Sequence, residues 1–186
     1  MFVIGITGSI SSGKTTVASL MAGKKYPLFS ADKAVLNLYK KKDFIKILVK
    51  KFKLNQDKKI KEQMKLVLKK NKKNFPKLEA IVHPLVRKEM KIFLKKKNKL
   101  LFLEIPLLIE SKLKNYFDRI IFVDAKKKVR LKRYLKKNDD KKIFSLLDSR
   151  QISSVVKKMK CDYTFNNNYS LAVLKKNVKN FMKNYE

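Results

Sequence analysis

The sequence predicts an α/β fold in which a mostly parallel, five-stranded sheet is flanked by helices. Two observations along the 186 residues support this class. Short apolar runs alternate with segments of helical periodicity, as they do where helices connect neighbouring parallel strands. The runs at residues 100–105 and 119–124 are largely apolar rather than alternating, which is typical of strands buried on both faces of a sheet.

The N-terminal elements follow from an apolar run, a turn and a glycine. Residues 2–6 form a first strand, and a turn rich in glycine and serine follows it. The next helix begins at Lys14 and ends at Gly23, because glycine commonly terminates helices. Residues 26–30 predict a second, short strand. In residues 34–99 apolar side chains recur at spacings of i, i+3, i+4 and i+7, which predicts helices.

The remaining elements are separated by polar segments. A polar break that ends at a proline interrupts the helical region at residues 69–77. After the two apolar strands, the lysine-rich residues 126–156 are expected to be helical, followed by a short strand at 163–166 and a final helix at 171–182. The sequence contains no internal repeat, and its length suits a single domain with its own core.

The composition is strongly basic. The chain has 48 lysines and arginines against 15 aspartates and glutamates, a formal net charge of +33. Such a surface attracts phosphate groups, which makes nucleic-acid binding an obvious hypothesis. Only five of the basic residues are arginines, however, and the planar guanidinium of arginine reads bases and phosphates better than lysine does. We therefore expect no specific nucleic-acid partner, and a basic nucleic-acid-binding protein with a P-loop switch stays an alternative.

The sequence shows no sign of a membrane or secretory segment. No window approaches 18 uninterrupted apolar residues, which a transmembrane helix would need. The N-terminus lacks a basic region ahead of its apolar run, so it does not resemble a signal peptide. Cys161 is the single cysteine, which suits a reducing compartment. We expect a cytoplasmic protein without a membrane partner, as a monomer or a weak homo-oligomer.

One motif carries specific chemistry: residues 8–15 read G-S-I-S-S-G-K-T and match G-x-x-x-x-G-K-[ST], the phosphate-binding P-loop. Backbone N–H groups of such a loop wrap a polyphosphate, and the start of the following helix adds the positive end of its dipole. Lys14 reaches the β- and γ-phosphates as a point charge, and the hydroxyl of Thr15 binds Mg²⁺. The predicted nucleotide-binding residues are Gly8, Ser11, Ser12, Gly13, Lys14, Thr15 and Thr16.

A P-loop alone does not distinguish a kinase from a GTPase or a motor ATPase. The guanine-reading motif Asn-Lys-x-Asp is absent, and the chain is too short for the coupling elements of a large ATPase. A small-molecule kinase that uses MgATP is therefore favoured, and a kinase of a nucleoside or a nucleoside monophosphate is one alternative. Such an enzyme needs a group that positions or deprotonates the acceptor hydroxyl, and a cationic lid over the phosphates.

Candidates for these tasks follow in order along the chain. Asp32 comes directly after the second strand, where it would face the P-loop across the strand tips, or it caps the next helix. His83 precedes a proline and is either part of the acceptor site or a structural turn residue. Residues 104–110 end the third strand at the carboxyl edge, where ligands bind. Arg130 and Arg133 lie three residues apart, hence on one helix face.

The order of these residues resembles the dephospho-CoA kinase family over nearly the whole chain. The segment Pro-Leu-Leu-Ile-Glu at 106–110 and the position of Asp32 are the specific parts, because many families share a P-loop. The matching landmarks are the P-loop, Ala31-Asp32, His83-Pro84, residues 106–110, the strand at 118–124, Gln151, Lys158, Cys161-Asp162 and Asn166. The resemblance implies phosphorylation by MgATP of the ribose 3′-hydroxyl of dephospho-CoA, the last step of coenzyme A synthesis.

The resemblance also implies a division of the chain within one domain, residues 1–186. The nucleotide-binding core would be formed by residues 1–55, 96–125 and 151–186, with a helical acceptor-binding insert at 56–95 and a closing lid at 126–150. Lid closure would exclude water from the phosphates and so prevent hydrolysis of ATP.

Residue roles follow from the same resemblance. The catalytic residues would be Asp32 as base, Lys14 and Arg133, and the lid cations would be Arg130, Arg133 and Lys137. The acceptor would contact Asp32, His83, Pro106, Leu107 and Glu110. Asn166 would cap a turn or approach the ATP base. The family usually has glycines at the positions of Ser9 and Ser11. It commonly has an arginine at the position of Lys137, and lysine keeps the charge there but lacks the bidentate guanidinium fork. Glu104, where many members have aspartate, would lie near Mg²⁺ or the acceptor.

Overall fold

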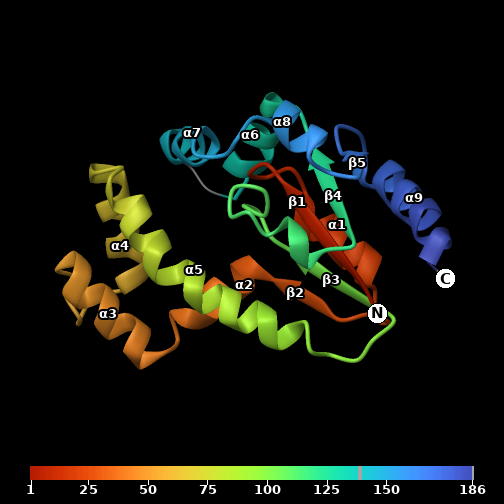
Figure 1. Ribbon diagram of the computed structural model, residues 1–186. Helices are drawn as coiled ribbons and strands as arrows, with labels where there is room; N and C mark the ends of the chain where they lie inside the picture. Colours follow the sequence, from red (N-terminus) through yellow and green to blue (C-terminus); the bar gives the residue numbers. More distant parts are fainter. Residues whose placement is uncertain (138–139, 186) are drawn as a thin grey trace. The chain divides into compact units, whose positions relative to one another are not determined.

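The computed structural model describes residues 1–137 and 140–185 (Figure 1). The chain divides into two compact units. One comprises Met1–Ser30 together with Lys96–Glu186, and the other comprises Ala31–Lys95. No helix among the described residues is both long and apolar enough to cross a bilayer.

The first unit is built on one sheet of five strands in the order β2-β3-β1-β4-β5, and every neighbouring pair is parallel (Figure 1). The strands are β1 (Phe2–Gly8), β2 (Leu28–Ser30), β3 (Leu100–Glu104), β4 (Arg119–Asp124) and β5 (Tyr163–Asn166). The expected parallel sheet is confirmed. β1 lies between β3 and β4, so the loop that follows Gly8 begins at the carboxyl edge, where such sheets bind ligands.

The second strand is shorter than the sequence pattern predicted. Tyr26 still donates its backbone N–H to the carbonyl of Ala22, in the turn that follows α1 (Lys14–Ala22). Pro27 has no N–H to donate, although its carbonyl accepts from the N–H of Phe102 in β3. Regular pairing with β3 therefore begins one residue later.

Both faces of the sheet are covered. On one face, α1 packs against α9 (Leu171–Met182), and the two helices bury a cluster with residues of β1, β3, β4 and β5. Gly5 points to the opposite face, where an added Cβ would lie 2.7 Å from Leu108 Cδ1 and 2.9 Å from Phe117 Cδ1. The segment after β3 therefore approaches the strand closely enough to require a glycine.

The region expected to be helical at residues 126–156 is divided into separate helices. The helices described in this region are α6 (Lys127–Leu135), α7 (Lys141–Ser149) and α8 (Ser154–Met159). Two short 3-10 helices lie outside it, η1 (Lys114–Tyr116) before β4 and η2 (Lys183–Tyr185) after α9. The side chain of Asp140 accepts from the N–H of Ile143 at 3.0 Å, and that of Ser153 accepts from the N–H of Val156 at 3.3 Å. Caps of this kind satisfy N–H groups of a first turn and so start new helices.

The second unit is helical throughout its regular structure. Its elements are α2 (Ala31–Leu38), α3 (Lys42–Phe52), α4 (Ile60–Lys70) and α5 (Asn74–Phe93). Their apolar faces meet in one core, whose buried members are Leu38, Phe44, Leu48, Ile60, Met64 and Val82. The helical segment expected at residues 56–95 lies within this unit.

Pro76 and Pro84 both lie inside α5, whereas the sequence pattern placed the first at the end of a break between helices and the second beside a turn residue. The break predicted at residues 69–77 is shorter, because α5 already begins at Asn74. Pro76 stands in the first turn of α5, where its missing N–H would have had no partner within the helix. His83 and Pro84 lie inside α5, so the interpretation of His83 as a turn residue is wrong.

Candidate functional site

The P-loop between β1 and α1 takes its compact shape from two residues with positive φ. Gly13 has a φ of 99° and Ser11 a φ of 56°. The left-handed region costs a residue other than glycine about 1–2 kcal/mol, so Ser11 depends on contacts elsewhere to stay there. At Gly13 an added Cβ would also meet the amide of Asn167. Serine is therefore tolerated at the one position, whereas the other requires glycine.

The start of α1 is open to an anion. Gly13 precedes the helix, no side chain of the described residues caps it, and its first turn contains no acidic residue. Thr15 and Thr16 are exposed at this end. An uncapped helix start offers N–H donors and the positive end of the helix dipole, which together favour phosphate. Lys14 is 8% exposed, and its Nζ donates to the carbonyl of Ser9 at 3.0 Å, so its ammonium lies against the loop.

A hydroxyl and a carboxylate meet beside this loop. The Thr15 hydroxyl donates to Glu104 Oε1 at 2.6 Å, and Glu104, the last residue of β3, is 1% exposed. Among the described residues, Glu104 Oε2 is buried without a hydrogen-bond partner. These oxygens are hard ligands that suit Mg²⁺, which usually takes one or two protein ligands besides phosphate and water. The residues present therefore fit a magnesium ion.

The segment from Pro106 to Glu110 is held by a buried lysine. Lys157, on α8, has no exposed surface, and its Nζ donates to Glu110 Oε1 at 2.9 Å and to the Pro106 carbonyl at 3.1 Å. The hydroxyl of Thr7 donates to the same carbonyl at 3.0 Å. Leu107, which follows Pro106 in the chain, is half-buried. Sequence reasoning selected Lys158, which is exposed, and missed the buried neighbour, Lys157.

The three cations expected in the lid have different surroundings. Arg130 is buried and lies 2.6 Å from Asp148 Oδ1, while Lys137 is exposed beyond the end of α6. Arg133 is half-buried beside the P-loop, where its two Nη atoms lie 3.4 Å from the Ser12 carbonyl and 3.5 Å from Asn167 Oδ1. The structure therefore brings Arg133 to the phosphate-binding loop with long hydrogen bonds that a stronger acceptor could replace.

Of the three consecutive asparagines at residues 166–168, where β5 ends, Asn167 contacts the P-loop. Asn167 is 6% exposed and donates from Nδ2 to the Ser12 carbonyl at 2.8 Å. Asn166 Oδ1 instead accepts from the backbone N–H of Asn168 at 3.1 Å and from its Nδ2 at 2.6 Å. Asn166 therefore caps a turn, as one of its two predicted roles required. The sequence offered Asn166 or Asn167 and the prediction chose Asn166, because adjacent residues of one type give no sign of which is buried.

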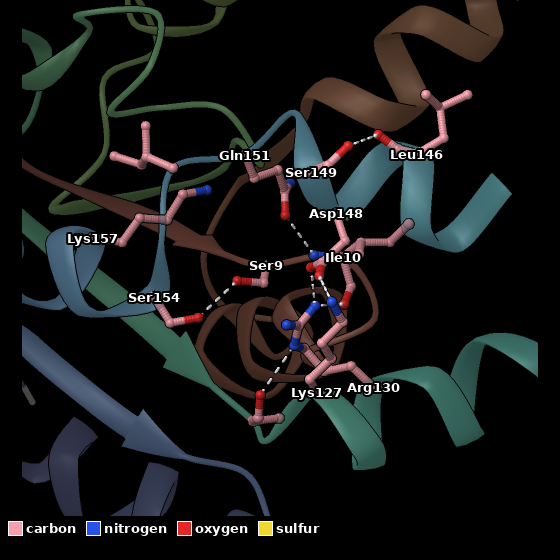
Figure 2. Close-up of polar contacts among 12 residues, drawn as sticks. Ser9, Ile10, Lys127, Arg130, Leu146, Asp148, Ser149, Gln151, Ser154 and Lys157 are labelled. Atoms are coloured by element: carbon pink, nitrogen blue, oxygen red, sulfur yellow. Dashed lines mark hydrogen bonds and ion pairs between the residues drawn. The ribbon is translucent and has the colours of Figure 1, made fainter. Parts of the chain in front are cut away.

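The P-loop has a further set of contacts with α6 and the residues around α7 and α8, shown in Figure 2. The N–H of Ile10 donates to Gln151 Oε1 at 2.9 Å, and the hydroxyls of Ser9 and Ser154 are 3.2 Å apart. Gln151 is one of the candidates that follow in order along the chain and a landmark of the resemblance, but the sequence predicted no role for it. Its contact with a backbone group of the P-loop could not be read from the sequence.

Asp32 and His83 belong to the second unit. Asp32 is exposed and is the second residue of α2, inside the first turn rather than before it. Burial lowers the pKa of His83 below its ordinary value, with Glu79 opposing this shift and Arg87 adding to it. His83 is therefore neutral at pH 7 and can donate or accept a hydrogen bond.

Comparison with known proteins agrees with this geometry. The family model for dephospho-CoA kinase matches residues 2–172. The dephospho-CoA kinase of Bartonella henselae is 32% identical over 170 residues, which cover 88% of this chain and 87% of that protein. Among solved structures, TT1252 from Thermus thermophilus has a TM-score of 0.79 at 26% identity and covers 98% of this chain and 97% of its own. Dephospho-CoA kinase from Campylobacter jejuni has a TM-score of 0.66 at 25% identity, with coverage of 99% and 97%. The chain therefore belongs to the dephospho-CoA kinase family.

Proposed function

We propose that this protein transfers the γ-phosphoryl group of ATP to the ribose 3′-hydroxyl of dephospho-CoA, which gives coenzyme A and ADP. The observation that carries the proposal is the contact of Thr15 with Glu104 at the uncapped start of α1. It places a hydroxyl and a buried carboxylate beside a phosphate cradle, in a chain of this family. Neither a nucleoside kinase nor a nucleic-acid-binding protein is favoured by any observation of this structure.

Mg²⁺ would be held by Thr15 and Glu104. The buried Oε2 of Glu104, which has no hydrogen-bond partner among the described residues, supports this assignment. The described residues contain no group of three or more His, Cys, Asp or Glu side chains that could hold a metal, so phosphate oxygens and water would complete the coordination. The ion would neutralise charge on the β- and γ-phosphates.

Lys14, Arg133 and Lys137 would supply the positive charge around the transferring phosphoryl group. The ammonium of Lys14 has three donors, so it would keep its contact with the Ser9 carbonyl and contact the β- and γ-phosphates with the others. Arg133 would give up its two long contacts for phosphate oxygens, which are stronger acceptors. The exposed Lys137 would act from the far end of α6, with the lid at residues 126–150 excluding water.

The acceptor would be bound by Asp32, His83, Pro106, Leu107 and Glu110. Asp32 would take the proton of the 3′-hydroxyl or align that hydroxyl for in-line attack. Neutral His83 would contribute a hydrogen bond and no charge. The segment from Pro106 to Glu110 would form a rigid wall, because Lys157 ties both of its ends.

The substrate assignment is tested by an acceptor screen with labelled ATP. We expect rapid transfer to dephospho-CoA and slow transfer to nucleosides and nucleoside monophosphates. Turnover of ATP that is no faster with dephospho-CoA than without it would refute the assignment. Faster transfer to a nucleoside monophosphate would assign the protein to that substrate instead.

The base is tested by Asp32→Asn, which should lower kcat by about 10²–10⁴-fold and leave ATP affinity unchanged. Asp43→Asn, an acidic residue in the first turn of α3, is the matched control and should keep full turnover. Equal activity of the two variants would reduce Asp32 to a residue of the helix start.

We further propose that the protein works in the cytoplasm, as a monomer or a weak homo-oligomer, without a specific nucleic-acid partner. Its positive charge would raise the local concentration of anionic substrates at low salt. Binding to oligonucleotides should be lost at physiological salt. Sequence-selective binding that persists there would contradict this.

A further inference from the structure

The backbone of Ile10, in the P-loop, is hydrogen-bonded on both sides by residues distant in sequence (Figure 2). Its N–H donates to Gln151 Oε1 at 2.9 Å, and its carbonyl accepts from Arg130 Nη1 at 3.4 Å. Gln151 lies between α7 and α8, and Arg130 lies on α6. The side chain of Ile10 packs against the cluster of Tyr134 and Phe144. The α6–α8 segment therefore contacts one P-loop residue through its N–H, its carbonyl and its side chain.

Arg130 is too firmly held to serve as a phosphate ligand. It is 5% exposed, its Nε donates to the carbonyl of Ala125 at 3.0 Å, and its Nη1 lies 2.6 Å from Asp148 Oδ1. Lys127 Nζ approaches the other oxygen of Asp148 at 3.3 Å (Figure 2). Moving the guanidinium to a phosphate would deprive a mostly buried carboxylate of its closest partner, which is strongly unfavourable. Its contacts suit a role in which Arg130 stays in place.

The contact with Gln151 orients the peptide group between Ser9 and Ile10. A trans peptide carries its carbonyl and its N–H on opposite sides of one plane, and the described residues contain no cis peptide. Because Gln151 holds the N–H of Ile10, the carbonyl of Ser9 faces the other way. That carbonyl accepts from Lys14 Nζ at 3.0 Å and from the N–H of Ser12 at 3.1 Å. Gln151 therefore helps to place the ammonium of the P-loop lysine.

The contact with Arg130 orients the next peptide group, between Ile10 and Ser11. Because Arg130 holds the carbonyl of Ile10, the N–H of Ser11 faces away from α6. Ser11 is also the residue with a φ of 56°, a conformation that serine does not favour by itself. The contact of Arg130 with the neighbouring Ile10 carbonyl helps to hold Ser11 in this conformation.

We propose that Gln151 and Arg130 are positioning residues for the phosphate chain of ATP. They set the two peptide groups that flank Ile10, and through them the place of the Lys14 ammonium and the direction of the Ser11 N–H. The inference rests on the proposed nucleotide site and is independent of which acceptor is phosphorylated. Neither residue touches the substrate.

The test is calorimetric binding of ATP without acceptor. Gln151→Leu removes the oxygen that accepts from Ile10 and should raise the Kd for ATP about 3–10-fold, the usual effect of one hydrogen bond. Gln151→Glu keeps an acceptor oxygen and should restore the Kd to within about threefold of the original chain. Arg130→Lys keeps the charge beside Asp148 but loses the fork, and should raise the Kd about 3–10-fold.

Ser154→Ala is the matched control, because among residues 1–137 and 140–185 the Ser154 hydroxyl contacts only the side chain of Ser9 and neither peptide group. It should leave the Kd unchanged. In turnover assays Gln151→Leu should raise the KM for ATP and leave the KM for dephospho-CoA as it was. A purely structural defect would reduce the binding stoichiometry and leave the Kd unaltered.

The inference is overturned if Gln151→Leu binds ATP with the original Kd, if Ser154→Ala weakens binding equally, or if only the stoichiometry changes. A chain that shows the expected Kd pattern but does not phosphorylate dephospho-CoA would refute the proposed function and uphold the positioning role.

Discussion

Replacing Lys157 by methionine should destabilise the first unit strongly, because it removes one partner of a buried ion pair. The lysine has no exposed surface, and the side chain of Glu110 is 16% exposed. Without Lys157, Glu110 Oε1 would retain, within the part of the chain that the structure describes, only the N–H of Ile152 at 3.2 Å, and the carbonyl of Pro106 would lose one of its two donors there. Leaving one partner of a buried pair uncompensated costs about 3–5 kcal/mol. At about 2–4 °C per kcal/mol for a chain of this size, Tm should fall by roughly 6–20 °C.

The measurement is urea unfolding followed by circular dichroism, with Lys158→Met as the matched control. Lys158 is adjacent and exposed, so its replacement should change the free energy of unfolding by less than about 0.5 kcal/mol. The double variant Lys157→Met with Glu110→Gln removes the orphaned charge and should recover part of the loss. If Lys157→Met is no less stable than Lys158→Met, the reasoning from the buried pair is refuted.

Three further predictions concern single side chains. Glu104→Gln should raise the Mg²⁺ concentration needed for half-maximal activity by about tenfold or more, since it removes the charge of one metal ligand, and an unchanged Mg²⁺ titration would contradict the assignment. Burial, with Asp162 adding to the effect, raises the pKa of the Cys161 thiol to about 11. At pH 8 this thiol should therefore react with iodoacetamide roughly 100-fold more slowly in the folded chain than in the unfolded chain. Comparable rates in the two states would contradict the raised pKa. The lowered pKa of His83 means that the unfolded chain binds its proton more readily, so this contribution to stability is present above about pH 6.5 and is lost on acidification. His83→Gln should therefore lose less stability than the original chain between about pH 7.5 and pH 5 in urea unfolding; equal losses would show that His83 does not contribute.

The elements that bury apolar surface were predictable from the sequence. The strands Arg119–Asp124 and Tyr163–Asn166 and the helix Leu171–Met182 have the bounds that their apolar patterns indicated. Covering a strand on both faces requires apolar side chains at nearly every position, and that requirement is visible in one dimension. The P-loop was predictable for a related reason, since its glycine, lysine and threonine occupy fixed places along the chain.

The polar contacts of the site were less predictable, because they depend on which of several similar residues is buried. Lys157 and Lys158 are indistinguishable in a chain dominated by lysine, and so are Asn166 and Asn167. In each pair the tertiary structure buries only one. Arg130 was expected to contact phosphate as a scarce arginine in the lid region, and its partner Asp148 carries no sequence signal of its own.

The central claim, phosphoryl transfer to the ribose 3′-hydroxyl, is tested most directly by locating the phosphate in the product. Dephospho-CoA and its 3′-deoxy analogue would each be incubated with MgATP, and the products examined by mass spectrometry and ³¹P NMR. The account predicts a new phosphate monoester at the 3′ position and no product from the analogue. A phosphate elsewhere on the acceptor, or equal turnover of the 3′-deoxy analogue, would contradict it.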